Sequence, residues 1–363
     1  MKILYIGTET FNWVIDICNA IGEQGHEVIG IIQNKFGYNP EIKHKDDNVR
    51  FLQITPEMAA TGETFLKIIE KVYEKEKPDF VFCSHYPNVP IITELKHRTG
   101  CIAGAMILDV PSDLIKKDEK RQKMWKLLKT CLLNLDLVIV NTEIAREELS
   151  KILEKELPKE NMILYGIGLP EKYENSGIDK KGDYVISVCR INRIKNCILI
   201  PQALSYLDLK LKYIAVGADE NEEVSIVKDL CERYGIEFEH RAQITDNEKF
   251  ELIKNSSMLI YPQNSEYIGG LSPFEAMWCG KPAIVPDLQI YNSLYLDNAY
   301  YFDNNNAKDL ANKIGLVHTY KRGVFKAELL DAHDYVKDNL SYATMAKKLI
   351  ERMEKTLNDA NRT

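Results

Sequence analysis

Short apolar runs alternate with amphipathic segments of helical length along most of the chain. In the first half, the apolar runs predict strands near residues 2–6, 26–33, 79–85, 101–110, 135–141 and 162–166. The segments between them repeat apolar positions at helical spacing, which predicts helices near residues 11–24, 62–76, 112–133 and 143–155. Such alternation is typical of α/β domains with doubly wound parallel sheets.

A polar, turn-rich stretch at residues 169–182, reading LPEKYENSGIDKKG, interrupts this pattern. The alternation restarts at Tyr184, with further strands predicted near residues 211–217, 236–241, 257–262 and 282–286. The chain length of 363 residues suffices for two domains that each bury a core. We therefore expect four segments, which are a first domain at 1–170, a linker at 171–183, a second domain at 184–340 and a last helical segment at 341–363.

Composition and charge narrow the class of protein. The formal net charge is −7, which gives no general attraction to nucleic acid. The sequence opens directly on a predicted strand and has no apolar run of membrane-spanning length, so we expect a cytoplasmic location. Eight cysteines without Cys-x-x-Cys spacing are expected to be mostly reduced core residues, with neither a disulfide framework nor a metal site.

The segment Tyr261–Pro282 combines a strand end, a glycine pair and the start of a helix. Gly269 and Gly270 allow a ligand to approach the backbone closely, and the first amides of a helix favour negative charge. Ser272 is the expected N-cap of that helix. Glu275 has two interpretations, because it is either a ligand-binding carboxylate or the second member of a capping box with Ser272.

Two cations follow the strand that begins at Tyr184. Arg190 can contact two phosphate oxygens through its planar guanidinium, and Lys195 supplies a compact positive charge. Cations at the end of a buried strand suit a diphosphate group. Arg193 lies between them, and we interpret it as a solvated surface residue.

These two segments together resemble the retaining glycosyltransferases of family 4, which have the GT-B fold. Arg190 and Lys195 stand at the family spacing, and GLSPFEAMWCGKP at residues 270–282 matches the second half of the family's glutamate motif. Weaker matches are GHEV at 25–28, YGIG at 165–168 and VG at 216–217. The resemblance implies two Rossmann-like doubly wound domains facing a central cleft, with the C-terminal helix crossing back to the first domain.

The resemblance also implies roles for individual residues. The family's second glutamate binds the donor ribose, and Glu275 occupies that position. The family's first glutamate contacts the donor sugar, but eight residues separate Glu266 from Glu275 here instead of seven, so a strict count places Tyr267 at that position. The remaining donor contacts implied by the motif positions are Gly217, Gly269, Gly270, Leu271 and Ser272.

The first domain departs further from the family pattern. Gly7 and Thr8 stand where the family often has a Gly-Gly pair that contacts the donor phosphates or the acceptor. Asp109 stands where the family presents a histidine to the donor sugar, which makes it a candidate partner of the acceptor hydroxyl. The alternative is that Asp109 caps a helix beginning near Ser112. His85 ends the preceding strand and either replaces that histidine or is structural.

The activity implied by the resemblance is hexosyl transfer from a nucleoside-diphosphate sugar to an acceptor hydroxyl, with retention, without a metal ion and without a cofactor. Two alternatives stay open, which are a non-catalytic sugar-nucleotide-binding scaffold and a GT-B sugar-nucleotide epimerase. The absence of Gly-x-Gly-x-x-Gly after the first strand counts against a nicotinamide dehydrogenase.

The acceptor is a glycan, a lipid-linked compound or a small molecule, and the sequence does not distinguish these. The predicted helix at residues 115–133 gives the one clue. This segment places seven basic residues beside an apolar face. Such a helix either contacts an anionic membrane surface or packs its apolar face on the core and exposes its basic face to solvent.

Overall fold

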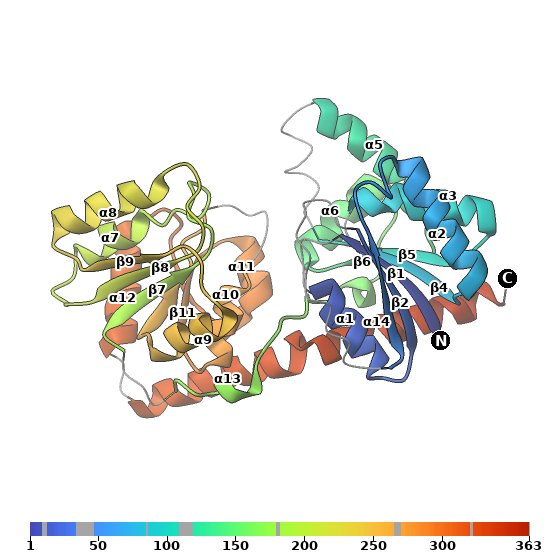
Figure 1. The fold of residues 1–363 in the computed structure, drawn as a ribbon. Helices are drawn as coiled ribbons and strands as arrows, with labels where there is room; N and C mark the ends of the chain where they lie inside the picture. Colours follow the sequence, from blue (N-terminus) through green and yellow to red (C-terminus); the bar gives the residue numbers. More distant parts are fainter. Residues whose placement is uncertain are drawn as a thin grey trace. The chain divides into compact units, whose positions relative to one another are not determined.

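The computed structural model describes residues 1–8, 13–33, 47–84, 86–108, 119–178, 182–264, 270–319 and 322–362. The chain divides into two compact units (Figure 1). Unit 1 consists of Met1–Gly168 together with Leu340–Thr363, and unit 2 consists of Leu169–Asn339. Each unit is described separately below.

Unit 1 contains a six-stranded sheet in the order β3-β2-β1-β4-β5-β6, and all its neighbouring strands are parallel. Its strands are β1 (Lys2–Thr8), β2 (Glu27–Gln33), β3 (Val49–Ile54), β4 (Phe80–Ser84), β5 (Ala103–Ile107) and β6 (Leu137–Val140). Its helices are α1 (Trp13–Gly22), α2 (Gly62–Glu76), α3 (Val89–Thr99), α5 (Glu119–Leu133), α6 (Glu143–Leu153) and α14 (Tyr342–Ala360), with short 3-10 helices η1 (Tyr86–Asn88) and η2 (Lys159–Asn161). The central strand β4 is buried along its whole length, as expected for a sheet covered on both faces.

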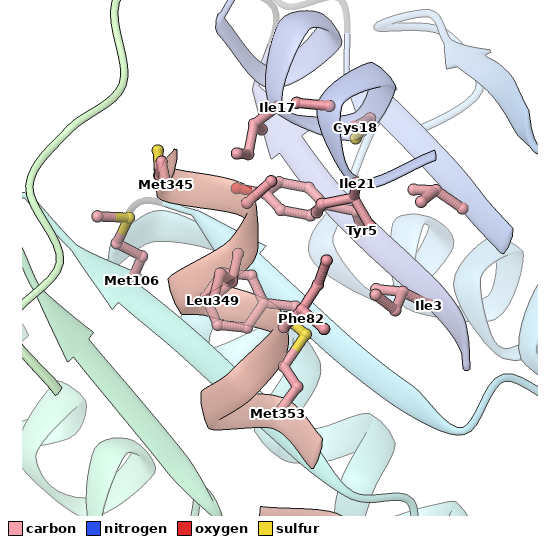
Figure 2. Packing of buried hydrophobic residues seen from close by; sticks show 14 of the residues in the cluster. Ile3, Tyr5, Ile17, Cys18, Ile21, Phe82, Met106, Met345, Leu349 and Met353 are labelled. Carbon is pink, nitrogen blue, oxygen red and sulfur yellow. The ribbon is translucent and has the colours of Figure 1, made fainter. Parts of the chain in front are cut away.

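The C-terminal helix α14 completes the core of unit 1. It packs against α1, and its residues Met345, Leu349 and Met353 are buried in one cluster with Tyr5 and Phe82 of the sheet. Figure 2 shows these side chains pointing toward one another. Ser341 caps the helix by accepting a hydrogen bond from the backbone N–H of Thr344 at 3.0 Å.

Unit 2 contains a second six-stranded parallel sheet, in the order β12-β11-β10-β7-β8-β9. Its strands are β7 (Tyr184–Val188), β8 (Lys212–Val216), β9 (Phe238–Arg241), β10 (Met258–Ile260), β11 (Ala283–Pro286) and β12 (Tyr300–Phe302). Its helices are α7 (Leu199–Leu204), α8 (Glu223–Tyr234), α9 (Asp246–Asn255), α10 (Ser272–Trp278), α11 (Gln289–Tyr295), α12 (Ala307–Thr319) and α13 (Arg322–Leu340, whose last residue is assigned to unit 1), with 3-10 helices η3 (Glu171–Tyr173) and η4 (Leu296–Asn298). A separate cluster of buried apolar residues forms its core.

Several elements differ from the sequence predictions. Residues 162–166 form no strand, and Met162 makes only an isolated bridge to Val140. The backbone N–H of Gly166, at the end of this segment, donates to Sδ of Met345 at 3.1 Å. Strands β3 and β12, which lie at sheet edges, and helix α3 were not predicted.

Residues 171–178, at the start of the expected linker, are packed into unit 2. The Tyr173 side chain is buried, and its ring stacks on Phe250 with 5.1 Å between centroids. The backbone N–H groups of Asn175 and Gly177 donate to the carbonyls of Trp278 and Cys279 at 2.9 and 2.8 Å. These bonds make the segment part of the domain.

Candidate functional site

A pocket of about 270 Å³ lies at the carboxyl ends of the unit 2 strands. The residues that line it come from β7 and the segment after it, and from α9, the end of β10 and the start of α10. They are Val188, Cys189, Arg190, Lys195, Lys249, Tyr261, Leu271, Ser272 and Glu275. Because β7 and β10 are adjacent in the sheet, the two segments singled out in the sequence meet at this edge.

Lys195 is held firmly on the β10 side of the pocket. Its Nζ donates to the hydroxyl of Tyr261 at 2.6 Å and to Oε1 of Gln263. Burial lowers the pKa of Lys195 from its ordinary value of 10.5, and the nearby charge of Arg190 adds to this effect. The lysine is therefore a fixed and partly desolvated cation.

Arg190 is more exposed and is held from the other side. Its side chain is 67% exposed, and Nη1 donates to Oε1 of Glu220 at 2.9 Å. Asn192 donates to the other oxygen of Glu220 at 2.7 Å. The hydrogen bond from Asn192, together with that from Arg190, lowers the pKa of the Glu220 carboxyl. Through these two bonds Glu220 anchors the segment that follows β7. Arg193 is 89% exposed and pairs with Glu223, as expected for a surface residue.

Glu275 faces Lys249 in the pocket, and it does not form a capping box. Its Oε1 accepts a hydrogen bond from Nζ of Lys249 at 2.8 Å, and its side chain is only 12% exposed. Helix α10 begins at Ser272, so that Leu271 is the N-cap residue, and no side chain caps it. The capping interpretation of Glu275 is therefore wrong, and so is the assignment of Ser272 as the N-cap.

Leu271 and Ser272, at the start of α10, differ in solvent exposure. The Ser272 side chain is buried, and within the described residues its Oγ has no hydrogen-bond partner. Leu271 is 40% exposed. Both residues line the pocket, as do the two cations and Glu275.

Two glycines permit close backbone packing around the site. A Cβ atom on Gly270 would lie 2.3 Å from Cζ of Tyr261, and the carbonyl of Gly270 accepts a hydrogen bond from the Tyr295 hydroxyl at 2.6 Å. Gly217 has φ of +134°, and a Cβ atom there would lie 2.0 Å from the carbonyl oxygen of Cys189. A larger side chain at either position would therefore force its neighbours to shift.

The remaining candidates lie in unit 1 or outside the described residues. Gly7 and Thr8 end β1, and Gly7 packs directly against Val14. The structure does not describe His85, Asp109, Glu266, Tyr267 or Gly269.

Sequence reasoning missed Lys249, Tyr261, Gln263 and Glu220 as parts of the site. Lys249 lies on α9, whose start at Thr245 and Glu248 forms a capping box that the sequence displays. That signal locates the helix but does not indicate which of its lysines faces a pocket. The contacts of Tyr261 and Gln263 follow from their position just after β10.

Within the described residues, the cysteines are not cross-linked and no group of side chains is arranged to bind a metal ion. All eight cysteines are free, and seven are buried. Cys189 differs because it lines the pocket, with its sulfur 3.7 Å from that of Cys197. In the part of the chain that the structure describes, no three His, Cys, Asp or Glu residues are grouped to hold a metal ion.

Comparisons with known proteins bear on the fold and the class of activity. Residues 170–320 match the family described as glycosyl transferases group 1. Sucrose-phosphate synthase from Thermosynechococcus elongatus superposes with a TM-score of 0.78 at 15% identity, covering 99% of this chain and 100% of that one. A glycosyltransferase from Rickettsia africae gives a TM-score of 0.78 at 16% identity, covering 98% of both chains.

A third similar structure is Anabaena HepE in complex with UDP and glucose, with a TM-score of 0.73 at 14% identity, covering 98% of this chain and 100% of that one. No curated protein matches the chain by sequence. The structural matches confirm the predicted GT-B fold of two Rossmann-like α/β domains. The match over residues 170–320 adds a similarity to the glycosyl transferases group 1 family for that part of the chain.

Proposed function

We propose that this protein is a retaining glycosyltransferase of the family 4 type, which moves a sugar from a nucleoside-diphosphate sugar to an acceptor hydroxyl. The observation that carries the proposal is the unit 2 pocket, where Arg190, Lys195 and Glu275 line one space at the carboxyl ends of adjacent strands. This combination of two cations and one carboxylate suits a ligand with both a diphosphate and hydroxyl groups.

In the proposed reaction, Arg190 and Lys195 bind the diphosphate. Negative charge grows on this leaving group as the glycosidic bond lengthens, so the two cations stabilise the transition state more strongly than the bound substrate. The hydrogen bonds that fix Lys195 to Tyr261 and Gln263 support this role, because a preorganised cation need not reorient during the reaction. Glu275 accepts hydrogen bonds from the donor ribose.

The glycine positions and the start of α10 would form the remaining donor contacts. Gly269, Gly270, Leu271 and Ser272 follow β10 and lead into α10, and Gly217 follows β8 beside Cys189. Glu266, or Tyr267 in its place, would contact the transferred sugar.

Unit 1 would contribute the acceptor side of the reaction. We assign Gly7 and Thr8 to contacts with the donor phosphates or the acceptor, Asp109 to the acceptor hydroxyl and His85 to the donor sugar. The reaction as proposed needs no metal ion and no cofactor. UDP is the first nucleotide to test, because HepE, which has a similar fold, was solved with UDP.

We also propose a cytoplasmic location with peripheral membrane contact through residues 115–133. The described part of this segment, α5, exposes Lys123, Lys126 and Leu127, while Trp125 and Leu128 are buried. Within the described residues, no helix is long and apolar enough to cross a membrane. Sedimentation with anionic liposomes at low salt tests the contact, and its absence would contradict this part of the proposal.

A panel of nucleotide sugars, incubated with the protein without acceptor or metal, tests the main proposal. We expect one donor to bind and to release its nucleoside diphosphate slowly by hydrolysis, and NMR of the released sugar to show retained anomeric configuration at early times. Tight binding without release would favour a scaffold, and epimerisation of the nucleotide sugar would favour an epimerase. Failure of every donor to bind would refute the assignment of the pocket.

A further inference from the structure

Among the described residues, Lys249 is the one pocket-lining cation that neither segment singled out in the sequence contains. It lies on α9, whose start is fixed by the capping box of Thr245 and Glu248 and whose Phe250 and Ile253 are buried. The Lys249 side chain is 19% exposed. Lys249 is therefore a largely buried side chain on a well-anchored helix, unlike a flexible lysine on the surface.

Lys249 links a partly buried carboxylate to an exposed one. Its Nζ donates to Oε1 of Glu275 at 2.8 Å and to Oδ1 of Asp246 at 3.0 Å, and Asp246 is 85% exposed. Burial by itself would lower the pKa of Lys249, but the charges and hydrogen bonds of Glu275 and Asp246 outweigh burial and raise that pKa. The lysine consequently remains protonated at neutral pH.

The hydrogen bond from Lys249 fixes the orientation of the Glu275 carboxylate in the pocket. A carboxylate held by one charged donor keeps its remaining acceptor positions for a ligand. An ionised carboxylate has about four acceptor positions, so one bond from Lys249 leaves capacity for two neighbouring hydroxyl groups.

We propose that Lys249 is a positioning residue for ribose recognition, which holds Glu275 directed into the pocket so that Glu275 accepts hydrogen bonds from the two ribose hydroxyls of the donor. This inference rests on the proposed function and adds a residue to it. It makes the discrimination between ribose and deoxyribose depend on a residue that makes no bond to the ribose itself.

Helix α9 provides a matched control in Lys254. This lysine is on the same helix, is 18% exposed and pairs with Glu251 at 2.9 Å. It does not line the pocket. Replacing Lys254 with methionine therefore removes the same charge and an equivalent ion pair from the same helix, away from Glu275.

The experiment measures the affinity of UDP and of 2′,3′-dideoxy-UDP by calorimetry. We expect the unmodified protein to bind UDP about tenfold to a hundredfold more tightly than the dideoxy analogue, as hydrogen bonds to a charged group suggest. Lys249→Met should bring this ratio close to one, mainly through weaker binding of UDP, whereas Lys254→Met should keep the original ratio. An unchanged ratio in Lys249→Met would overturn the inference.

A second variant keeps the test decisive if Lys249→Met does not fold. In Lys249→Gln the amide can still donate to Glu275, but the positive charge is gone. The affinity ratio should then lie below that of the unmodified protein, because a neutral amide holds a carboxylate less strongly than an ammonium group does. A ratio equal to that of the unmodified protein would also overturn the inference.

The same measurements separate this inference from the proposed function. If UDP does not bind the unmodified protein, the assay is repeated with ADP, GDP and CDP and their dideoxy analogues. Failure of all four nucleotides would refute the proposed function, and the inference with it. Binding of one nucleotide with an equal ratio in all variants would leave the proposed function in place and remove only the role of Lys249.

Discussion

Lys195 and Tyr261 are joined by a hydrogen bond of 2.6 Å from Nζ to the tyrosine hydroxyl. The same hydroxyl donates to Oε1 of Gln263 at 2.8 Å, and the Tyr261 side chain is 3% exposed. The loop that carries Lys195 is bound to the loop after β10 by its backbone as well, since the N–H of Asn264 donates to the carbonyl of Ile194 at 3.1 Å. Lys195 is thus fixed in place by contacts within the protein, as an electrostatic role in catalysis requires.

Replacing Lys195 with methionine should lower turnover by about a hundredfold to a thousandfold, the usual loss when one preorganised stabilising group is removed. The fold should persist, because methionine can occupy the apolar part of the lysine's space. Arg193→Ala is the control, since Arg193 lies on the same loop and is 89% exposed. Turnover of the donor by Lys195→Met at near the normal rate would contradict the proposed mechanism.

The affinity for nucleoside diphosphate should decrease at alkaline pH through Lys195. Burial places the folded-state pKa of this lysine below 10.5, so the charge that binds diphosphate is present below the lowered pKa and is lost as pH rises through it. Binding curves from about pH 8 to 10 should show this decrease, and Lys195→Arg should flatten it because arginine stays protonated. Circular dichroism at each pH excludes unfolding as the cause.

Arg190→Ala should separate activity from stability. The ion pair of Arg190 with Glu220 is exposed on both sides, with 67% and 37% exposure, so its loss should change the free energy of unfolding by less than about 1 kcal/mol. Turnover should fall by about a hundredfold or more, because a stabilising group for the leaving diphosphate is missing. Urea unfolding and donor hydrolysis measure the two effects on the same sample. A large loss of stability with unchanged turnover would indicate a structural role.

The fold was largely readable from the sequence because most strands of both sheets are buried on two faces. Buried parallel strands are continuous apolar runs, and β1, β4 and β7 accordingly match the predicted positions closely. Edge strand β3 was missed because only its two end residues, Val49 and Ile54, are buried, so that it does not form a continuous apolar run. The YGIG segment at 165–168 follows an apolar run, but its place beside α14 depends on a contact with Met345, which is distant in sequence.

The site was readable only in part. Arg190 and Lys195 could be placed because parallel strands end at one edge of the sheet. The choice between the two interpretations of Glu275 could not be made, because SPFE fits a capping box and the competing partner Lys249 lies on another helix. Local sequence does not encode which of two bonds a side chain makes when the second partner is supplied by tertiary packing.

Gly270→Ala should damage the pocket without changing any charge. The added methyl group would lie 2.3 Å from Cζ of Tyr261, so the Tyr261 ring or the backbone before α10 must shift. Because Tyr261 binds Lys195, we expect a loss of about 1 to 3 kcal/mol in stability and weaker nucleotide binding. The control is Gly315→Ala in α12, where the methyl group would meet Leu207 at an ordinary 3.6 Å. That variant should gain up to about 1 kcal/mol, since alanine favours a helix. Equal thermal shifts in the two variants would contradict this account.

The separate cores of the two units predict that unit 1 can be weakened without loss of the pocket. Leu349 on α14 is 1% exposed and packs in the cluster shown in Figure 2, so Leu349→Ala should cost unit 1 about 2 to 5 kcal/mol. The exposed neighbour Lys347→Ala should change stability by less than about 0.5 kcal/mol. The described residues that line the pocket all belong to unit 2, which has its own buried cluster. Nucleotide binding by Leu349→Ala should therefore persist after unit 1 begins to unfold in urea. Loss of binding together with the first unfolding transition would show that the donor pocket depends on unit 1.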